Sequence, residues 1–204
     1  MNNELIIRSS STSVDFALLK DGKLIELHKD EEDNQFSVGD IFIAKIRKTV
    51  SGLNAAFVNV GYEKDAFLHY HDLGPQLPTL LKFVKRVSTG KLKDFSLKNF
   101  PTEKDIDKNG KIADAVKSNQ SILVQVVKEP ISTKGPRISS ELSIAGRYVV
   151  LVPFSDRISI SQKIESREEK ARLKRLMQSI RPKGFGVIVR TVAEGKMVAE
   201  LDKD

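Results

Sequence analysis

The stretch Gly52-Leu53-Asn54-Ala55-Ala56-Phe57-Val58-Asn59-Val60-Gly61-Tyr62-Glu63-Lys64-Asp65-Ala66-Phe67-Leu68 decides how the rest of the chain is interpreted. Two short apolar segments flank a glycine and a polar turn, which is typical of a β-hairpin. Alternation along the first segment places Phe57 on one face with Ala55 and Asn59, and it places Ala56, Val58 and Val60 on a second, core-like face. We therefore expect Phe57 and Phe67 to be cross-strand neighbours.

These two phenylalanines allow two interpretations. Asn59 beside Phe57 is unusual in a core and natural on a wet binding face. Aromatic faces stack on single-stranded nucleic acid of any sequence while nearby Lys and Arg follow the phosphates, and each stacked base is worth about 1–3 kcal/mol. The alternative is that both rings belong to a β-rich core, and spacing alone leaves both interpretations open.

Composition limits the class of protein. The chain has 204 residues, with 34 Lys and Arg against 27 Asp and Glu, a net charge of +7 and a pI near 9.5. This length suffices for one large domain or two small ones, and the basic balance suits a polyanionic partner without identifying one. The absence of cysteine excludes disulfides within these residues and fits a cytoplasmic setting. We find neither a signal peptide nor 18 consecutive apolar residues, so we expect a soluble protein and no membrane partner.

The pattern of elements predicts a β-rich α+β fold in three regions. Residues 1–37 resemble a three-stranded β-meander. Residues 38–142 are typical of an OB-fold barrel with strands near 40–48, 54–60, 65–69, 121–128 and 136–142, interrupted by an insertion at 71–118. Residues 143–204 indicate a small α/β unit.

The insertion at 71–118 is basic, with ten Lys or Arg against six acidic residues. Leu81, Phe83, Val84 and Val87 follow a helical rhythm, and the Gly, Pro and polar residues after them predict a long, partly mobile loop. Two interpretations are open: a basic arm that gathers RNA, or a solvated insertion, which we favour.

The α/β unit has a clear helix signature. Ser166 starts a capping box, and Pro182 and Gly184 end the helix after an apolar face of Leu173, Leu176, Met177 and Ile180. The opposite face, with Lys170, Arg172, Lys174 and Arg175, is interpreted as solvated. We expect strands at 148–152, 158–160, 187–189 and 197–201, so that the chain ends after a strand without a terminal helix, as in an engineered truncation.

Three blocks carry a family resemblance: Gly39-Asp40-Ile41-Phe42-Ile43-Ala44-Lys45-Ile46, Ala55-Ala56-Phe57-Val58 and Ala66-Phe67-Leu68-His69. They resemble the S-one-type OB fold of bacterial ribonuclease E/G endonucleases. Further blocks extend the resemblance over most of the chain: Val124-Gln125-Val126-Val127-Lys128-Glu129-Pro130, Thr133-Lys134-Gly135, Ile144-Ala145-Gly146-Arg147-Tyr148 and Val187-Ile188-Val189-Arg190-Thr191-Val192-Ala193-Glu194-Gly195.

Arg190 and Thr191 follow an apolar strand and open a glycine-containing turn, and a guanidinium fork next to a hydroxyl suits a terminal phosphate. The resemblance implies that this pair holds a 5′-monophosphate in a 5′-sensor subdomain, whose pocket Gly146 and Val150 line. It also implies that Phe57, Phe67 and Lys134 contact single-stranded RNA. Where the family has an arginine pair, this chain has Ser161-Gln162-Lys163, so a phosphate contact from that strand is not expected.

The resemblance further implies an enzyme that cuts RNA in processing and decay with a magnesium-activated water held by aspartates of a later nuclease domain. Residues 1–37 would complete a ribonuclease-H-like subdomain whose other half lies later in the chain. We expect this chain to need no cofactor itself, to be inactive alone, and to form a homo-oligomer in the full-length enzyme. The alternatives are a stand-alone OB-fold RNA-binding protein and a protein-interaction scaffold.

Other candidate residues point to no catalytic or metal site. His69 and His71 have the spacing of metal ligands on a strand, but no third ligand is nearby in the sequence, and His28 is solitary. Asp105 and Asp107 are interpreted as a solubilising turn rather than a magnesium site.

Overall fold

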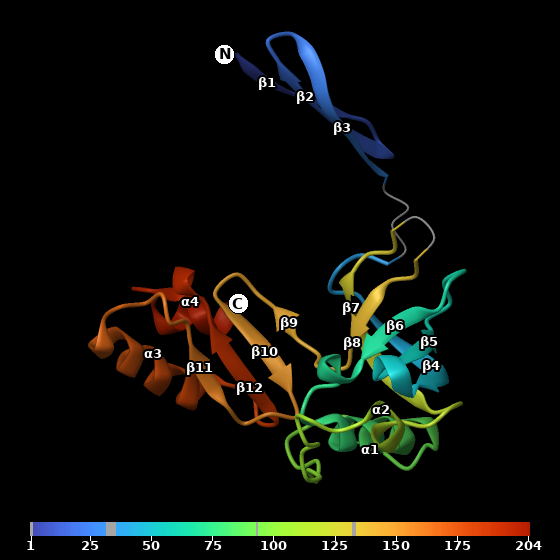
Figure 1. The fold of residues 1–204 in the computed structure, drawn as a ribbon. Helices are drawn as coiled ribbons and strands as arrows, with labels where there is room; N and C mark the ends of the chain where they lie inside the picture. The colour runs from blue at the N-terminus through green and yellow to red at the C-terminus, as the bar shows by residue number, and fades with distance from the viewer. Residues whose placement is uncertain (1, 32–35, 93, 132–133) are drawn as a thin grey trace. The chain divides into compact units, whose positions relative to one another are not determined.

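The fold is known from a computed structural model, which describes residues 2–31, 36–92, 94–131 and 134–204 (Figure 1). The chain divides into two compact units, Met1–Ser37 and Val38–Asp204. The second unit contains the barrel, the insertion and the α/β region.

The first unit is an antiparallel β-meander of β1 (Asn3–Ser9), β2 (Ser13–Lys20) and β3 (Lys23–Glu31). Asp21 and Gly22 both have positive φ, 49° and 75°, and make the tight turn between β2 and β3. The three expected strands are therefore confirmed. No residue between positions 2 and 29 is buried, and the large apolar residues Leu5, Ile6, Ile7, Leu24, Ile25 and Leu27 are all exposed.

The second unit begins with a closed barrel in the order β4-β5-β6-β8-β7, which is OB-fold-like. Its strands lie close to the five expected ranges: β4 (Ile41–Val50), β5 (Ala55–Asn59), β6 (Ala66–His69), β7 (Ser121–Lys128) and β8 (Arg137–Ser139). The barrel interior is filled by side chains from every strand, including the fully buried Ile46, Val58, Leu68, Ile122 and Ile138. Closure removes the open edges that a five-stranded sheet would otherwise present.

Ala55 departs from the predicted alternation. It was expected on the wet face with Phe57, yet it is as fully buried as Ala56. The cause lies in Asn54, whose side chain donates to Gly110 O at 3.1 Å and accepts from Ile112 N–H at 2.7 Å. These bonds bring the insertion over this end of β5, so the face alternation holds only from Phe57 onward.

The insertion contains the helices α1 (Leu77–Ser88) and α2 (Ile112–Ala115), which contact the barrel at β7 and β4, respectively (Figure 1). The helical rhythm is confirmed, with Pro78 in the first turn of α1 and Leu77, Leu80 and Val84 buried. The segment between the helices has little regular structure, but Phe100 packs against Phe83 of α1 and Phe154 of the α/β region, with ring centres 5.4 and 6.1 Å apart. The insertion thus joins the two halves of the second unit.

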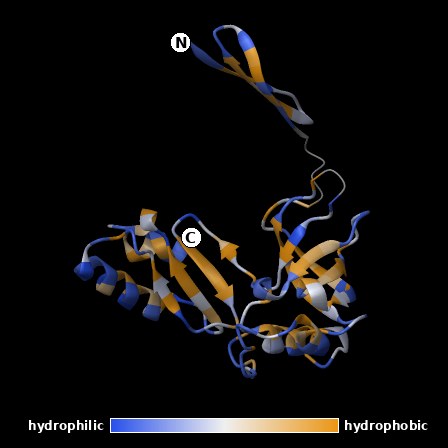
Figure 2. Cartoon of the chain, viewed as in Figure 1, coloured by the Kyte–Doolittle hydropathy of each residue, from blue (hydrophilic) through white to orange (hydrophobic). Residues whose placement is uncertain are grey.

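The α/β region is a four-stranded sheet in the order β11-β12-β10-β9, with only β11 and β12 parallel. Its strands are β9 (Ile144–Ala145), β10 (Val149–Pro153), β11 (Ile158–Ile160) and β12 (Phe185–Val189), and its helices are α3 (Arg167–Ile180) and α4 (Val198–Lys203). Figure 2 shows apolar colour along β10 and β12 and hydrophilic colour along much of α3. Leu173 and Met177 of α3, Val187 and Val189 of β12 and Leu201 of α4 form one buried cluster.

The expected strand at 197–201 is wrong, because these residues form the start of α4. Met197 N–H donates to the Glu200 carboxylate at 3.0 Å, which satisfies a free donor at the helix start. Leu201 then faces the core at 3% exposure, while Val198 remains 44% exposed. Six residues are too few to distinguish a helical period from the alternation of a strand. The hydrogen bond from Met197 N–H to Glu200 favours the helix. Within the described ranges, no helix is both long enough and apolar enough to cross a membrane.

Candidate nucleic-acid interface

Phe57 and Phe67 are directly opposite each other on β5 and β6, as predicted. Their ring centres are 6.0 Å apart in an edge-to-face arrangement, and both side chains are only half-buried. The adjacent residues Val58 and Leu68 are fully buried and point into the barrel. The barrel core is therefore complete without the two phenylalanine rings, which favours a binding face over the core interpretation.

The aromatic face continues past the hairpin. His69 follows Phe67 on the same side of β6, with ring centres 6.4 Å apart and ring planes 30° from parallel. His71 lies in the 3-10 turn Tyr70–Asp72, and its ring centre is 5.0 Å from that of His69. We refer to Phe57, Phe67, His69 and His71 as the aromatic row.

The two histidines of the aromatic row are linked by a hydrogen bond at the turn. His69 Nδ1 accepts a hydrogen bond from the His71 backbone N–H at 3.2 Å, so this nitrogen caps the turn. No cluster of three or more His, Cys, Asp or Glu side chains suitable for a metal ion occurs among the residues that the structure describes.

Positive charge lies beside the aromatic row. Lys48 Nζ is 5.4 Å from the centre of the Phe57 ring, within range of a cation–π contact. Arg137 is in register with Phe67 on the neighbouring strand and forms two hydrogen bonds of 3.0 Å with the Asp72 carboxylate. Because the ion pair with Asp72 neutralises the charge of Arg137, Lys48 is the better candidate for a phosphate contact at this face.

Lys134 lies in the connection between β7 and β8, where it is exposed and pairs by its backbone with Ile131. The next residue, Gly135, approaches the backbone carbonyls of Lys64 and Asp65 so closely that no side chain would fit there. Lys134 is therefore held near the turn of the β5-β6 hairpin. Thr133, which precedes it in the predicted motif, lies outside the described residues.

The four predicted phosphate-binding residues gather at one end of the α/β sheet. Arg190 directly follows β12, is exposed, and donates from Nη1 to the Gly146 carbonyl at 2.9 Å. Thr191 begins a 3-10 turn, with its hydroxyl 2.9 Å from that of Ser161. Val150 is half-buried on β10, opposite Ile188 of β12 and Ala145 of β9. The parallel pairing of β11 with β12 brings Ser161 to this end.

Asp204 is a residue of this site that the sequence did not reveal. Its carboxylate accepts hydrogen bonds from the backbone N–H groups of Arg147, Tyr148 and Val149, at 2.7, 3.0 and 3.0 Å. It also occupies the space that a Gly146 side chain would need, which explains the glycine. Burial opposes its ionisation, but the three donors and the charge of Arg190 outweigh burial and hold the pKa of Asp204 below its usual value. Asp204 is more than 50 residues from these three donors in the sequence, so no local signal pointed to it.

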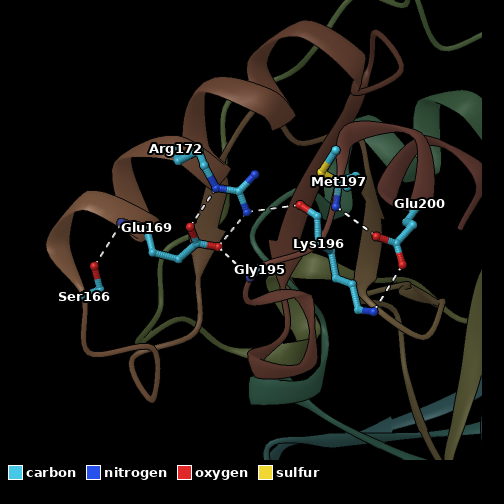
Figure 3. A network of polar contacts seen from close by, with 7 residues as sticks. All are labelled: Ser166, Glu169, Arg172, Gly195, Lys196, Met197 and Glu200. Carbon is cyan, nitrogen blue, oxygen red and sulfur yellow. Dashed lines mark hydrogen bonds and ion pairs between the residues drawn. The ribbon is translucent and has the colours of Figure 1, made fainter.

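A polar network holds the turn that follows Arg190 and Thr191 (Figure 3). Glu169 of α3 forms a two-bond ion pair with Arg172, at 2.7 Å for each bond, and accepts from Gly195 N–H at 2.9 Å. Arg172 donates to the Lys196 carbonyl at 3.1 Å, and Lys196 pairs with Glu200 of α4 at 3.1 Å. The Arg172 hydrogen bonds lower the pKa of Glu169 to about 2, so the carboxylate is charged at neutral pH. Arg172 is therefore part of this network rather than of a purely solvated helix face.

An OB-fold-like barrel with an exposed aromatic and basic face, joined to a small α/β region, defines this chain as a β-rich α+β protein of the kind that includes nucleic-acid binders. Residues 143–204 match the model of the ribonuclease E/G family. Outside these residues, the similarity is to individual proteins, whose sequences this chain matches over nearly its full length.

Two similar proteins are each named ribonuclease G. The one from Haemophilus influenzae is 33% identical over 98% of this chain and 37% of its own length, and the one from Escherichia coli (strain K12) is 32% identical over 100% of this chain and 38% of its own length. Ribonuclease E from Nostoc sp. is 36% identical over 82% of this chain and 20% of its own length. The chain thus spans well under half the length of the curated relatives it matches.

Proposed function

We propose that this chain is the single-stranded RNA-binding and 5′-monophosphate-sensing portion of a ribonuclease E/G-type endoribonuclease that acts in RNA processing and decay. The observation that carries the proposal is the half-exposed Phe57/Phe67 pair, which lies outside a complete barrel core beside Lys48. Unpaired bases stack on such rings, and the cation adds a contact to the backbone. Relationship to ribonucleases makes RNA the expected polyanion.

The proposed sensor is the group Arg190, Thr191, Gly146 and Val150. A terminal monophosphate carries more charge than an internal phosphodiester, so a guanidinium with an adjacent hydroxyl discriminates between 5′ ends. The bond from Arg190 to the Gly146 carbonyl supports this role, because it fixes the guanidinium before any RNA arrives.

Strand cleavage is assigned to residues beyond this chain. Hydrolysis with a magnesium-activated water needs several carboxylates around the ion, and the described residues offer no such cluster. Asp105 and Asp107 of the insertion do not supply one either. In this proposal, magnesium chemistry, homo-oligomerisation and a cytoplasmic location belong to the full-length enzyme.

Replacement of one ring tests RNA binding. Phe57→Ala is expected to weaken binding of all single-stranded RNAs alike, by about fivefold to more than a hundredfold, as loss of one stacked base implies. Fluorescence anisotropy with labelled RNAs of different sequence measures the loss. Phe95→Ala is the matched control, since Phe95 is an exposed phenylalanine of the insertion, 63% accessible.

The same experiment separates the alternatives. Unchanged RNA affinity in a folded Phe57→Ala variant would contradict the proposal, and unfolding of that variant would show that Phe57 belongs to the core. Affinity that falls only slightly with rising salt would favour a protein-interaction scaffold, because several phosphate contacts make RNA binding strongly salt-dependent.

A further inference from the structure

The turn between β9 and β10, at residues 146–148, binds Arg190 through its carbonyl groups. The Gly146 carbonyl accepts from Arg190 Nη1 at 2.9 Å, and the Tyr148 carbonyl accepts from the Arg190 backbone N–H at 2.9 Å. The side chain and the backbone of this exposed arginine are therefore both bonded to the same turn.

The N–H groups of the same turn are bonded to Asp204, which directly follows α4. The Asp204 carboxylate accepts from Arg147 N–H through Oδ1 at 2.7 Å, and from Tyr148 and Val149 N–H through Oδ2 at 3.0 Å each. Hydrogen bonds from backbone N–H groups to an ionised carboxylate are stronger than bonds between neutral groups. The carboxylate thus fixes three successive amides.

Two planar peptide units connect these two sets of hydrogen bonds. The Gly146 carbonyl and the Arg147 N–H belong to one unit, and the Tyr148 carbonyl and the Val149 N–H belong to another. In a trans peptide unit the C=O and N–H groups point in opposite directions and cannot rotate independently. Each unit therefore donates to Asp204 on one side and accepts from Arg190 on the other.

The helix α4 is itself held in place, so Asp204 has a fixed position. Leu201 is 3% exposed and belongs to the buried cluster of the α/β region. At the start of the helix, Glu200 pairs with Lys196 at 3.1 Å and accepts from Met197 N–H at 3.0 Å (Figure 3). Packing and polar contacts of α4 thus determine where the Asp204 carboxylate lies.

We propose that Asp204 is a positioning residue for the proposed 5′-monophosphate site, which holds the Arg190 guanidinium in its phosphate-binding orientation through the two peptide units of the β9-β10 turn. This inference rests on the proposed function, since it assumes that Arg190 binds the phosphate. Asp204 itself does not contact RNA in this arrangement. Without it, the arginine side chain would be ordered only when RNA binds, at a cost in affinity.

The charge of Asp204 has the opposite effect on phosphate binding, which makes the proposal testable by sign. Asp204 and Arg190 interact electrostatically, so the carboxylate competes with a phosphate for the guanidinium charge. If Asp204 acted by charge alone, its removal would tighten binding of a 5′-monophosphate. If it positions Arg190, its removal weakens that binding.

The test measures the affinity of the full chain for one short single-stranded RNA that carries either a 5′-monophosphate or a 5′-hydroxyl. Asp204→Ala should bind the monophosphate RNA about threefold to tenfold more weakly than the wild type does, as expected for ordering one arginine side chain on binding. Its affinity for the hydroxyl RNA should stay the same, because a 5′-hydroxyl offers Arg190 no terminal phosphate. The ratio of the two affinities therefore reports on positioning.

Two further variants control for other causes. Asp202→Ala removes the same charge from an exposed position of α4 and should keep the wild-type ratio. Asp204→Asn keeps an acceptor oxygen but places an NH₂ group among three N–H donors, so it should lose part of the preference for the monophosphate. It decides the matter if urea denaturation shows that Asp204→Ala does not fold.

Unchanged or tighter binding of the monophosphate RNA by the folded Asp204 variants would overturn the proposal. An equal loss of affinity for both RNAs would also overturn it, because that result means that Asp204 only supports the fold. Failure of the proposed function is distinguishable, since the wild-type chain would then bind both RNAs equally. A wild-type preference that the Asp204 variants retain would reject the positioning role alone.

Discussion

At the scale of single residues, Phe57 and Phe67 face each other across β5 and β6, while Val58 and Leu68 beside them are fully buried in the barrel. The Phe57/Phe67 pairing followed from alternation and a hairpin turn, both of which are local. Whether the rings were core or surface depended on whether Val58 and Leu68 already filled the barrel, and only the closed sheet shows that they do. Asp204 was missed because its three donors lie on a hairpin formed much earlier in the chain.

Glu169 gives a prediction for the pH dependence of stability. Its pKa in the fold is about 2, below the ordinary 4.5, because Arg172 and the Gly195 N–H bind the charged form. A group with a lowered pKa stabilises the fold above its unfolded-state pKa, and this contribution falls as the pH drops below about 4.5 and is lost near pH 2. Glu169→Gln should therefore lower the free energy of unfolding at pH 7 by about 1–2 kcal/mol and by clearly less at pH 3.

Urea denaturation at the two pH values measures this difference. Glu168→Gln is the control, because Glu168 occupies the same first turn of α3 and is exposed. An equal loss of stability in Glu169→Gln at pH 7 and pH 3 would show that the ion pair with Arg172 is not the source.

At the scale of elements, the helix α3 and the five barrel strands lie close to their expected ranges, whereas α4 was predicted wrongly. The capping box at Ser166 and the apolar face of α3 gave the correct helix, and Ser166 Oγ accepts from Glu169 N–H at 3.2 Å. In contrast, α4 has only six residues and was assigned as a strand. The packing of the insertion was also out of reach, because Phe83, Phe100 and Phe154 come from three segments with no shared pattern.

The contact between the insertion and the α/β region can be tested at Gly184. It has φ of +87°, and a Cβ atom there would lie 2.5 Å from the Leu97 carbonyl oxygen of the insertion. Gly184→Ala therefore combines an unfavourable backbone conformation with a clash and should cost about 2–4 kcal/mol of unfolding free energy. Gly195→Ala, with φ of +72° and nothing within 4 Å, should cost only about 1 kcal/mol.

Chemical denaturation measures the loss of unfolding free energy in both glycine variants. Because both positions have positive φ, the difference between the two losses reports the contact with Leu97 alone. Equal costs at the two positions would mean that the insertion does not rest against Gly184 in solution.

At the scale of the whole molecule, the aromatic row and the Arg190/Thr191 pair lie on different parts of the second unit. The barrel presents the aromatic row, and the α/β sheet presents Arg190 and Thr191 at the end of β12, with the insertion packed against both. That these two parts bind RNA and its 5′ end remains a prediction from the family resemblance. The residues proposed for each site were taken from motifs, whereas a supporting side chain such as Asp204 had no local signal.

The first unit differs in character from the second. Its three strands bury no residue between positions 2 and 29, and exposed apolar side chains occur on both faces of the meander. Sequence alone predicted the strands because Asp21-Gly22 and the alternation are local signals. It did not predict the exposure, since burial depends on what the sheet packs against.

We propose that this chain binds single-stranded RNA and recognises its 5′-monophosphate. The most direct test compares, at one low salt concentration, the affinity of the chain for a short single-stranded RNA with a 5′-monophosphate or a 5′-hydroxyl. We predict that the RNA with a 5′-monophosphate binds at least about tenfold more tightly, since charge-assisted hydrogen bonds from Arg190 and Thr191 are gained.

Two variants control this measurement. Arg190→Ala should abolish the difference in affinity without unfolding the chain. Arg157→Ala removes an exposed arginine at the opposite end of the parallel strand pair and should preserve the difference. Equal affinity of the wild-type chain for the two RNAs would contradict recognition of the 5′-monophosphate by Arg190 and Thr191. Failure to bind either RNA would contradict the proposed RNA-binding function itself.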